Sequence, residues 1–334
     1  MKKIILMITI LLSAFILVGC GKYGEKDIIK DLKEKMKECK KYNITGELTI
    51  YNNENKYKYD VSASYKKDNY YRVSLKNKIN NHEQIIIRNK NGVYVLTPSL
   101  NKSFKFQSEW PFNSSQTYLL QTLYNDIKND NNRKFKETKK RYIFTVGVDY
   151  PNNPDLIKQK IYFDKKLNIK KVEIYNKKGN IQMLMMFDKV DYKPSFKKNY
   201  FELKENMNSV NTNDDTKTVS KVDDIIYPMY MPKNTHLDNE EIVKKGTNGE
   251  RVILTYGGDK SFMFIQETAS KEKDLLTIPV FGEPEIITES VAAISDNSIS
   301  WMSDGMEYFI TSDKLSTNEL LEVVKSVSTM PVGK

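Results

Sequence analysis

Between residues 43 and 205 the side chains alternate between apolar and polar, and this alternation restricts the fold more than any other feature. In residues 57–66 every odd position is apolar and every even position is polar, and residues 44–50 and 71–75 continue the pattern. A period of two is that of a β-strand with one buried face. Further strand-like runs are residues 85–88, 93–96, 142–148, 161–163, 172–175 and 181–187. Links at 67–69, 89–92 and 177–180 have the composition of hairpin turns. We therefore predict an antiparallel meander of roughly ten strands.

Two helices are predicted within this region. In residues 25–41, Ile28, Leu32 and Met36 recur every four residues, as on one face of a helix. A second helix is expected at 116–130, where residues 119, 120, 123 and 127 form an apolar stripe and Ser114 and Ser115 are candidate caps. Both stripes predict that the helices pack on the sheet.

Residues 206–221 contain no aromatic residue and predict a flexible linker between two domains, 25–205 and 222–334. In the second domain, 251–256 and 261–266 predict one hairpin, and 298–302 with 307–310 a second. A final helix is expected at about 317–326, where Ser316 and Glu319 have the spacing of a capping box. The second domain is therefore predicted to be a smaller α+β unit.

The first nineteen residues have the pattern of a signal peptide. Met1-Lys2-Lys3 is basic, and residues 4–18 are apolar except for Thr9 and Ser13. This run is shorter than the about 20 apolar residues that a permanent span needs. Leu17-Val18-Gly19-Cys20 resembles the bacterial lipobox. The resemblance implies cleavage after Gly19, a diacylglycerol on Cys20 and an added acyl chain such as palmitate. An ordinary signal peptide or anchor with an incidental cysteine remains the alternative.

A lipidated Cys20 would place the mature protein on the extracytoplasmic face of the cell membrane. Residues 20–24 would then be its lipidated tether, which reaches at most about 14 Å. The charge is uneven, because residues 222–334 hold 10 Lys and Arg against 19 Asp and Glu, whereas residues 1–221 hold 43 against 24. In an exported protein, nucleic acid is not the expected partner of the basic part. Anionic lipid headgroups or wall polymer are candidates, and a merely solvated basic surface is the other interpretation.

The sequence offers few groups for catalysis. It has only two histidines, His82 and His236, in different predicted domains and without metal-ligand spacing. It contains no Walker loop, no G-x-S-x-G and no G-x-G-x-x-G motif. With Cys20 lipidated, Cys39 has no partner for a disulfide, and we expect it to be a small buried apolar residue. We predict no catalytic residue, no metal and no cofactor, although a pair of carboxylates could in principle hydrolyse glycosides.

One apolar surface is a candidate binding site. In residues 181–187, Leu184 and Met186 face away from the other apolar side chains, so both sides of this strand need cover. The predicted loop nearby holds four aromatic residues, which are Phe104, Phe106, Trp110 and Phe112. The functional interpretation is a groove for an acyl chain or a partner's apolar segment. The structural interpretation, that all six side chains are ordinary packing, stays open.

The lipobox, one helix, a long meander interrupted by a helix, and an aromatic loop together resemble the LolA-like lipoprotein-sorting fold. The resemblance covers residues 25–205 and implies an unclosed antiparallel β-barrel whose concave face is covered by helices. The C-terminal part is similar to the domain that follows such a fold in YdcC-like sporulation lipoproteins of endospore-forming Firmicutes. The resemblance is carried by residues 227–232, 254–257, 262–267, 301–305 and 315–321.

The germination lipoprotein GerS resembles the N-terminal part, which implies binding of a cell-wall (cortex) amidase. We therefore expect a non-enzymatic, membrane-anchored lipoprotein of the cell envelope, with a binding or regulatory role in sporulation, cortex modification or germination. The alternative is a protein that binds or transfers acyl lipid or lipoproteins.

Overall fold

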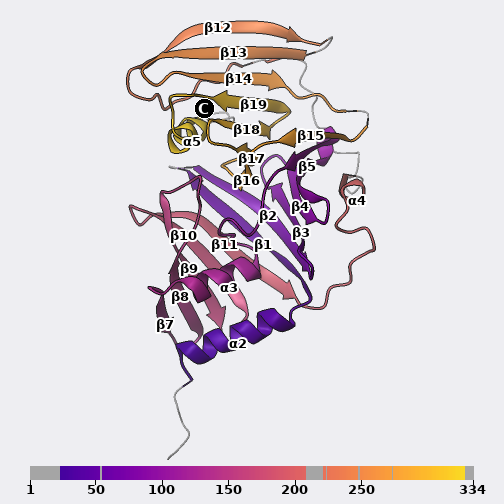
Figure 1. The fold of residues 1–334 in the computed structure, drawn as a ribbon, viewed down its shortest axis with the longest axis vertical. Coiled ribbons are helices and arrows are strands. Elements are labelled where there is room, and N and C mark those ends of the chain that lie inside the picture. The colour runs from indigo at the N-terminus through magenta and orange to yellow at the C-terminus, as the bar shows by residue number, and fades with distance from the viewer. Residues whose placement is uncertain are drawn as a thin grey trace, which may run out of the picture.

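The computed structural model describes residues 23–52, 55–207, 221–222, 224–246, 249–272 and 274–327. Within these ranges the protein is mainly β, with two open sheets and few helices (Figure 1). The predicted fold class is confirmed. The predicted signal peptide, Cys20 and most of the predicted linker lie outside the described residues. No helix in the described part of the chain combines the length and the apolar character needed to cross a membrane.

The larger sheet is built from two meanders. Its strands in chain order are β1 (Lys41–Asn52), β2 (Asn55–Lys66), β3 (Tyr70–Asn77), β4 (Glu83–Asn89), β5 (Gly92–Thr97), β6 (Lys102–Phe106), β7 (Lys134–Glu137), β8 (Arg141–Gly147), β9 (Leu156–Asp164), β10 (Ile169–Asn176) and β11 (Ile181–Asp191). β11 returns beside β1 and pairs with it in antiparallel register, so that the two meanders become one curved sheet. β7 lies at one edge, and β15 (Leu276–Val280) pairs in parallel with β6 at the other.

The period-two pattern places the core on the concave face of this sheet. Leu48 on β1 lies opposite Tyr59 on β2 and Met185 on β11, and all three side chains are buried. Directly opposed residues on antiparallel strands share a face, so each register pair extends the same apolar surface. The odd positions of residues 57–63 belong to it, as the alternation predicts.

β1 and β11 slip by one residue within their pairing. The register shifts between Thr45 and Gly46, which marks a β-bulge. A Cβ atom at Gly46 would lie 2.1 Å from the carbonyl oxygen of Met186. Only glycine allows the two backbones to approach so closely.

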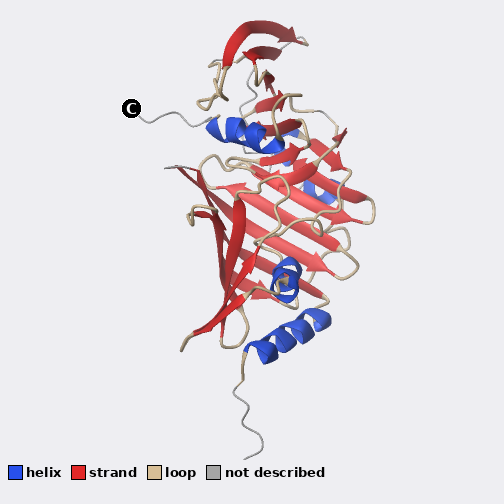
Figure 2. Cartoon of the chain, turned by 60° about the vertical axis from the view of Figure 1, so that its left-hand side comes forward, coloured by secondary structure: helices blue, strands red, loops and turns tan. Residues whose placement is uncertain are grey.

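Two helices cover the lower part of the concave face, α2 (Glu25–Glu38) and α3 (Leu120–Asn129) (Figures 1 and 2). Their buried side chains include Ile28, Leu32, Leu123 and Ile127, which confirms both predicted stripes. A short helix, α4 (Leu203–Met207), instead packs on the convex face of β4 and β5. η1 (Pro98–Leu100) is a single turn between β5 and β6.

The predicted helix boundaries are partly wrong. α2 ends at Glu38, three residues early, because Cys39 adopts extended backbone and leads into β1. Cys39 is half-buried against the core, and burial raises the pKa of its thiol. α3 begins at Leu120 instead of Gln116. Ser115 does not cap it, because its backbone and side chain bond to the backbone of Asp149.

The second sheet contains β12 (Thr235–Lys245), β13 (Gly249–Gly258), β14 (Phe262–Thr268), β16 (Glu283–Ile286), β17 (Val291–Ile294), β18 (Ser298–Ser303) and β19 (Met306–Thr311). Their order is β12-β13-β14-β19-β18-β17-β16. Both predicted hairpins are present as β13–β14 and β18–β19. The sequence analysis missed β6, β7, β12 and β15–β17, because these strands are short, polar or lack regular alternation. The prediction of a loop from residue 104 is wrong, because Phe104 and Phe106 lie on β6.

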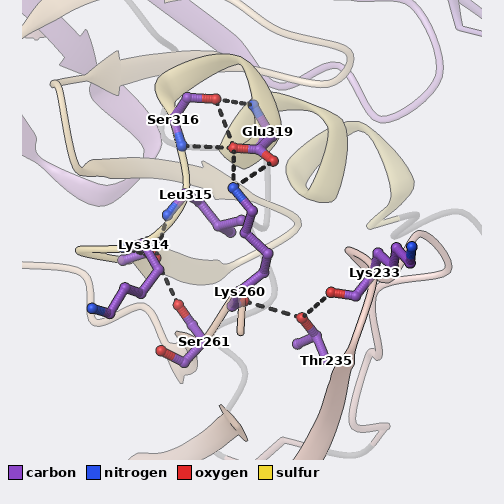
Figure 3. A network of polar contacts seen from close by, with 9 residues as sticks. Lys233, Thr235, Lys260, Ser261, Lys314, Leu315, Ser316 and Glu319 are labelled. Carbon is purple, nitrogen blue, oxygen red and sulfur yellow. Dashed lines mark hydrogen bonds and ion pairs between the residues drawn. The ribbon is translucent and has the colours of Figure 1, made fainter. Parts of the chain in front are cut away.

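The last helix, α5 (Thr317–Ser326), packs Leu320, Leu321 and Val324 into the core of this second sheet. Its predicted capping box is present (Figure 3). The Glu319 carboxylate accepts from the backbone N–H of Ser316 at 2.9 Å, and the N–H of Glu319 donates to the Ser316 hydroxyl. Lys260 adds an ion pair to Glu319 at 3.1 Å. These bonds from Ser316 and Lys260 lower the pKa of Glu319.

We expect Ser316→Ala to lower the free energy of unfolding by about 1 kcal/mol, because the first turn of α5 loses its side-chain acceptor. The measurement is chemical denaturation at neutral pH. Asn318→Ala is the matched control, since Asn318 is exposed in the same turn and is not the N-cap residue. Equal stability of the two variants would contradict the assigned cap.

Candidate binding site at the junction of the two sheets

The C-terminal part of the chain closes the upper end of the curved sheet (Figure 1). β15 extends the sheet edge at β6, with Ile278 opposite Phe104. Val291 on β17 belongs to the core of the first sheet, and Val280 and Ile286 pack against it. Residues from β15–β17 therefore complete the core of the first sheet, while the rest of the second sheet keeps a core of its own.

Hydrogen bonds between distant parts of the chain fix this junction. The Gln84 side-chain oxygen accepts from the backbone N–H of Val291 at 2.6 Å. The Tyr59 hydroxyl donates to the carbonyl oxygen of Thr288 at 2.8 Å. Gln84 and Tyr59 are buried, and a buried polar group left without a partner costs about 1–3 kcal/mol. The relative position of the two sheets is thus specified by buried polar contacts as well as by apolar packing.

A cavity of about 310 Å³ lies at this junction. Its walls come from β4, β5 and β6 of the first sheet and from β13, β14 and β17–β19 of the second. The lining residues are Gln84, Val95, Phe104, Phe106, Arg251, Ile265, Glu267, Val291, Ala293, Ser300, Trp301, Met302, Glu307, Tyr308 and Phe309. A mostly apolar cavity of this size, with a few polar groups, has the character of a small-ligand site.

Two ion pairs contribute side chains to the cavity wall, through Glu307 in one pair and through Arg251 and Glu267 in the other. Lys102 on β6 is buried and pairs with Glu307 on β19, so this contact joins the two sheets. Arg251 pairs with Glu267 at 2.5 Å, and its side chain is partly exposed. Buried charges are stable only when they are paired, so loss of either member of the Lys102–Glu307 pair would strongly destabilise the junction. Arg251 and Glu267 can instead meet a polar group of a ligand.

The concave face beneath the helices is filled by side chains. The hollow between α2, α3 and Leu167 measures about 20 Å³, and that beside Tyr118 and Glu285 about 40 Å³. Ligand pockets measure about 300–1,000 Å³, so neither hollow has room for an acyl chain. The junction cavity is several times larger than either and can hold a molecule with several carbon atoms.

The structure separates the six residues of the predicted apolar surface. Phe104 and Phe106 line the junction cavity. Trp110 does not form a lip, because it is buried in the core at an edge-on contact with Tyr71. Phe112 is half-exposed and stacks on the Arg88 guanidinium, 4.9 Å from its ring centre.

Leu184 and Met186 lie on the convex face, the opposite side of the sheet from Phe106. Their neighbours Met183, Met185 and Phe187 point into the concave core, as the alternation predicts. Met186 is exposed, and Leu184 is half-buried. The six predicted residues thus form no single groove, because a period of two sends adjacent side chains to opposite faces.

The sequence analysis missed the contribution of the second sheet to the cavity. Arg251, Glu267, Trp301 and Phe309 supply much of its wall. The alternation in residues 262–268 was a usable signal, since Phe264 and Gln266 are buried in one core while Ile265 and Glu267 point the other way. The sequence did not show which part of the chain packs against that second face of β14.

The described residues contain no group of three side chains that could hold a metal ion. His82 is half-buried, and its desolvation lowers its pKa, whereas His236 is exposed on the second sheet. Two carboxyl groups have a raised pKa because of burial, Asp126 at about 6 and Glu285 at about 7. Glu285 lies on β16 beside Tyr118 and Tyr150, where the second sheet meets the concave core.

We expect Glu285 to make stability fall as pH rises from about 4.5 to about 7, because within this window the folded state keeps a proton that the unfolded state has lost. Glu285→Gln should therefore unfold like the wild type at pH 4.5 and be more stable by up to about 3 kcal/mol at pH 8.

Urea denaturation at both pH values measures this difference. The exposed Glu322→Gln on α5 serves as the control and should follow the wild type. If Glu285→Gln changed the free energy of unfolding by the same amount at both pH values, the raised pKa of Glu285 would be contradicted.

These features define a class, a two-sheet β protein whose curved first sheet is closed by the second, with a ligand-sized cavity between them. A family model described as "Sporulation protein YdcC-like" matches residues 1–201. The Sporulation protein YdcC of Bacillus subtilis (strain 168) is 37% identical over 330 residues, which cover 98% of this chain and 97% of that protein. The chain belongs to the YdcC-like sporulation protein family.

Several solved structures are similar at low sequence identity. MucB matches with 13% identity and a TM-score of 0.35, over 91% of this chain and 98% of that chain. A putative outer membrane lipoprotein-sorting protein domain from Vibrio parahaemolyticus matches with 13% identity and a TM-score of 0.34, over 54% and 97%. The complex of the CwlD amidase from Clostridioides difficile with the GerS lipoprotein matches with 14% identity and a TM-score of 0.31, over 52% and 96%.

Proposed function

We propose that this protein is a lipid-anchored lipoprotein of the cell envelope that acts in sporulation by binding a partner, without catalysing a reaction. The similarity to a sporulation protein over nearly the whole of both chains carries this proposal. The lipobox pattern at residues 17–20 supports the anchor. The sequence has only two histidines and none of the catalytic motifs considered above, which favours binding over catalysis.

The shape of the molecule is compatible with anchoring through Cys20. The N-terminal helix α2 lies at the lower end of the molecule, and the acidic second sheet lies at the opposite end (Figure 1). With a tether of a few residues, the basic first sheet would rest near the bilayer, where each basic residue gains about 1 kcal/mol from anionic lipid. The second sheet would then face away from the membrane.

We expect Cys20→Ser to abolish incorporation of labelled palmitate and to move the protein out of the membrane fraction, because the thiol is the proposed acceptor of lipid. Metabolic labelling and fractionation of sporulating cells measure both effects. Cys39→Ser is the matched control and should stay membrane-bound and labelled. A Cys20→Ser protein that remains in membranes would refute the anchor.

The protein partner that we propose first is a cell-wall amidase acting on the spore cortex. The solved complex of the GerS lipoprotein with the CwlD amidase motivates the choice of this class. The convex face at Met186 is a suitable contact surface, because this exposed side chain lies between Glu47 on β1 and Lys171 on β10. An exposed methionine adapts to a partner's shape.

Met186→Glu should reduce co-purification of the amidase from sporulating cells at least tenfold, since a charge replaces the apolar contact. Ile79→Glu, at an exposed turn elsewhere, is the control and should leave it unchanged. Retention of the amidase by Met186→Glu would exclude this surface.

The second candidate function is binding of an acyl chain in the junction cavity. It is supported by the volume of about 310 Å³, the aromatic walls and the partly exposed Arg251 at the cavity. An acyl chain would lie against Phe104 and Phe106, and its polar end would meet Arg251. This function and partner binding through the convex face use different surfaces.

Native mass spectrometry of the protein from membranes should show added masses of acyl lipid if this candidate is right. Ser300→Leu narrows the cavity and should remove them. Ser270→Leu, at an exposed position, should keep them. A wild-type protein that carries no lipid beyond that attached at Cys20 would eliminate the acyl-binding function without affecting the protein-partner function.

A further inference from the structure

β12 is an edge strand with an open side. It stands at the end of the second sheet, where β13 pairs with it on one side. In an edge strand every second backbone N–H and C=O group points away from its neighbour and can pair with another strand. β12 runs for eleven residues, from Thr235 to Lys245, so this open side is long.

An exposed isoleucine lies in the middle of this strand. Ile242 lies directly opposite Val252 of β13, so both side chains are on the same face of the sheet. Val252 is fully buried in the core, whereas Ile242 is 55% exposed. The apolar face of the second sheet therefore continues onto the edge strand and ends there uncovered.

A β-bulge fixes which part of β12 can take a further strand. The register with β13 shifts between Leu237 and Asn239, which interrupts the regular ladder at Asp238. The strand ends at Lys245. The regular stretch is thus 239–245, and Ile242 is its central residue.

The charges of this stretch complement each other under two-fold symmetry. When two copies of the stretch are placed antiparallel about Ile242, Ile242 meets Ile242 and Lys244 meets Glu240. The latter pair occurs twice, and all of these side chains lie on one face, because positions 240, 242 and 244 have the same parity. Glu240 and Lys244 are exposed and carry opposite charges. Opposite charges across neighbouring strands stabilise the pair, whereas like charges destabilise it.

We propose that a second copy of this chain docks at β12, so that two second sheets join as one continuous antiparallel sheet with its two-fold axis at Ile242. β12 lies at the end of the molecule farthest from α2 (Figures 1 and 2). The pair is therefore joined end to end, with the two α2 helices at opposite ends, so two copies anchored through the proposed lipid would stand on membranes that face each other. Seven paired residues bury less area than a standard stable interface, so the dimer forms in a concentration-dependent way.

Disulfide formation tests the register directly. Opposed residues on antiparallel strands have Cα atoms about 4.5–5.5 Å apart, which a disulfide can bridge. In the full chain carrying Cys39→Ser, Ile242→Cys should form a disulfide-linked dimer under mild oxidation. Met263→Cys is the matched control, because Met263 is also exposed but lies on a strand that is paired on both sides. The Cys39→Ser parent shows any dimer formed through Cys20.

Charge exchange tests the pairing without cysteines. Glu240→Lys alone and Lys244→Glu alone each place like charges opposite each other, and we expect the dimer dissociation constant to rise at least tenfold. The double variant restores opposite charges and should restore the dimer. Analytical ultracentrifugation of the full chain in detergent over a concentration series measures this, and circular dichroism verifies the fold of each variant.

Three results would overturn the proposal. The first is a wild-type chain that stays monomeric at all concentrations, and the second is a dimer in which Ile242→Cys links no more than Met263→Cys. The third is a double variant that is as weak as the single variants, because the two copies then do not meet in this register.

Discussion

The pairing of β11 with β1 is the contact on which the rest of the structure depends. It joins two meanders into one curved sheet, and Gly46 allows the two backbones to approach closely at the bulge in that pairing. Without this pairing, the apolar faces of β1–β3 and β11 would belong to separate small sheets. The concave side of the curved sheet must be covered by other elements, because Leu48, Tyr59 and Met185 would otherwise expose a large apolar surface.

Two different parts of the chain cover the concave side of the first sheet. α2 and α3 fill the lower half of the concavity, and β15–β17 with their loops fill the upper half. Side chains thus fill the concave face of the curved sheet, and the larger cavity lies at the junction with the second sheet. This arrangement explains why the junction cavity has walls from both halves of the chain and why paired charges such as Lys102 and Glu307 lie beside it.

The two sheets also divide the surface of the molecule electrostatically. The basic part of the sequence builds the first sheet, next to the N-terminal end, and the acidic part builds most of the second. The end of the molecule that holds α2, the convex face at Met186 and the open edge of β12 lie at three separate places. Separate surfaces allow one chain to be held at a membrane while it binds another protein, since no site must be vacated for another to be used.

The sequence by itself determined the period-two strands, the apolar stripes of α2, α3 and α5, the capping box at Ser316 and the two hairpins of the second sheet. These features are local, because propensity, periodicity and turn chemistry act over a few residues. Only the tertiary structure decided that Trp110 is core, that Met186 lies across the sheet from Phe106, and that β15 pairs with β6. Each of these depends on which distant strands meet, and alternation gives the two faces of a strand but not the partner that covers each one.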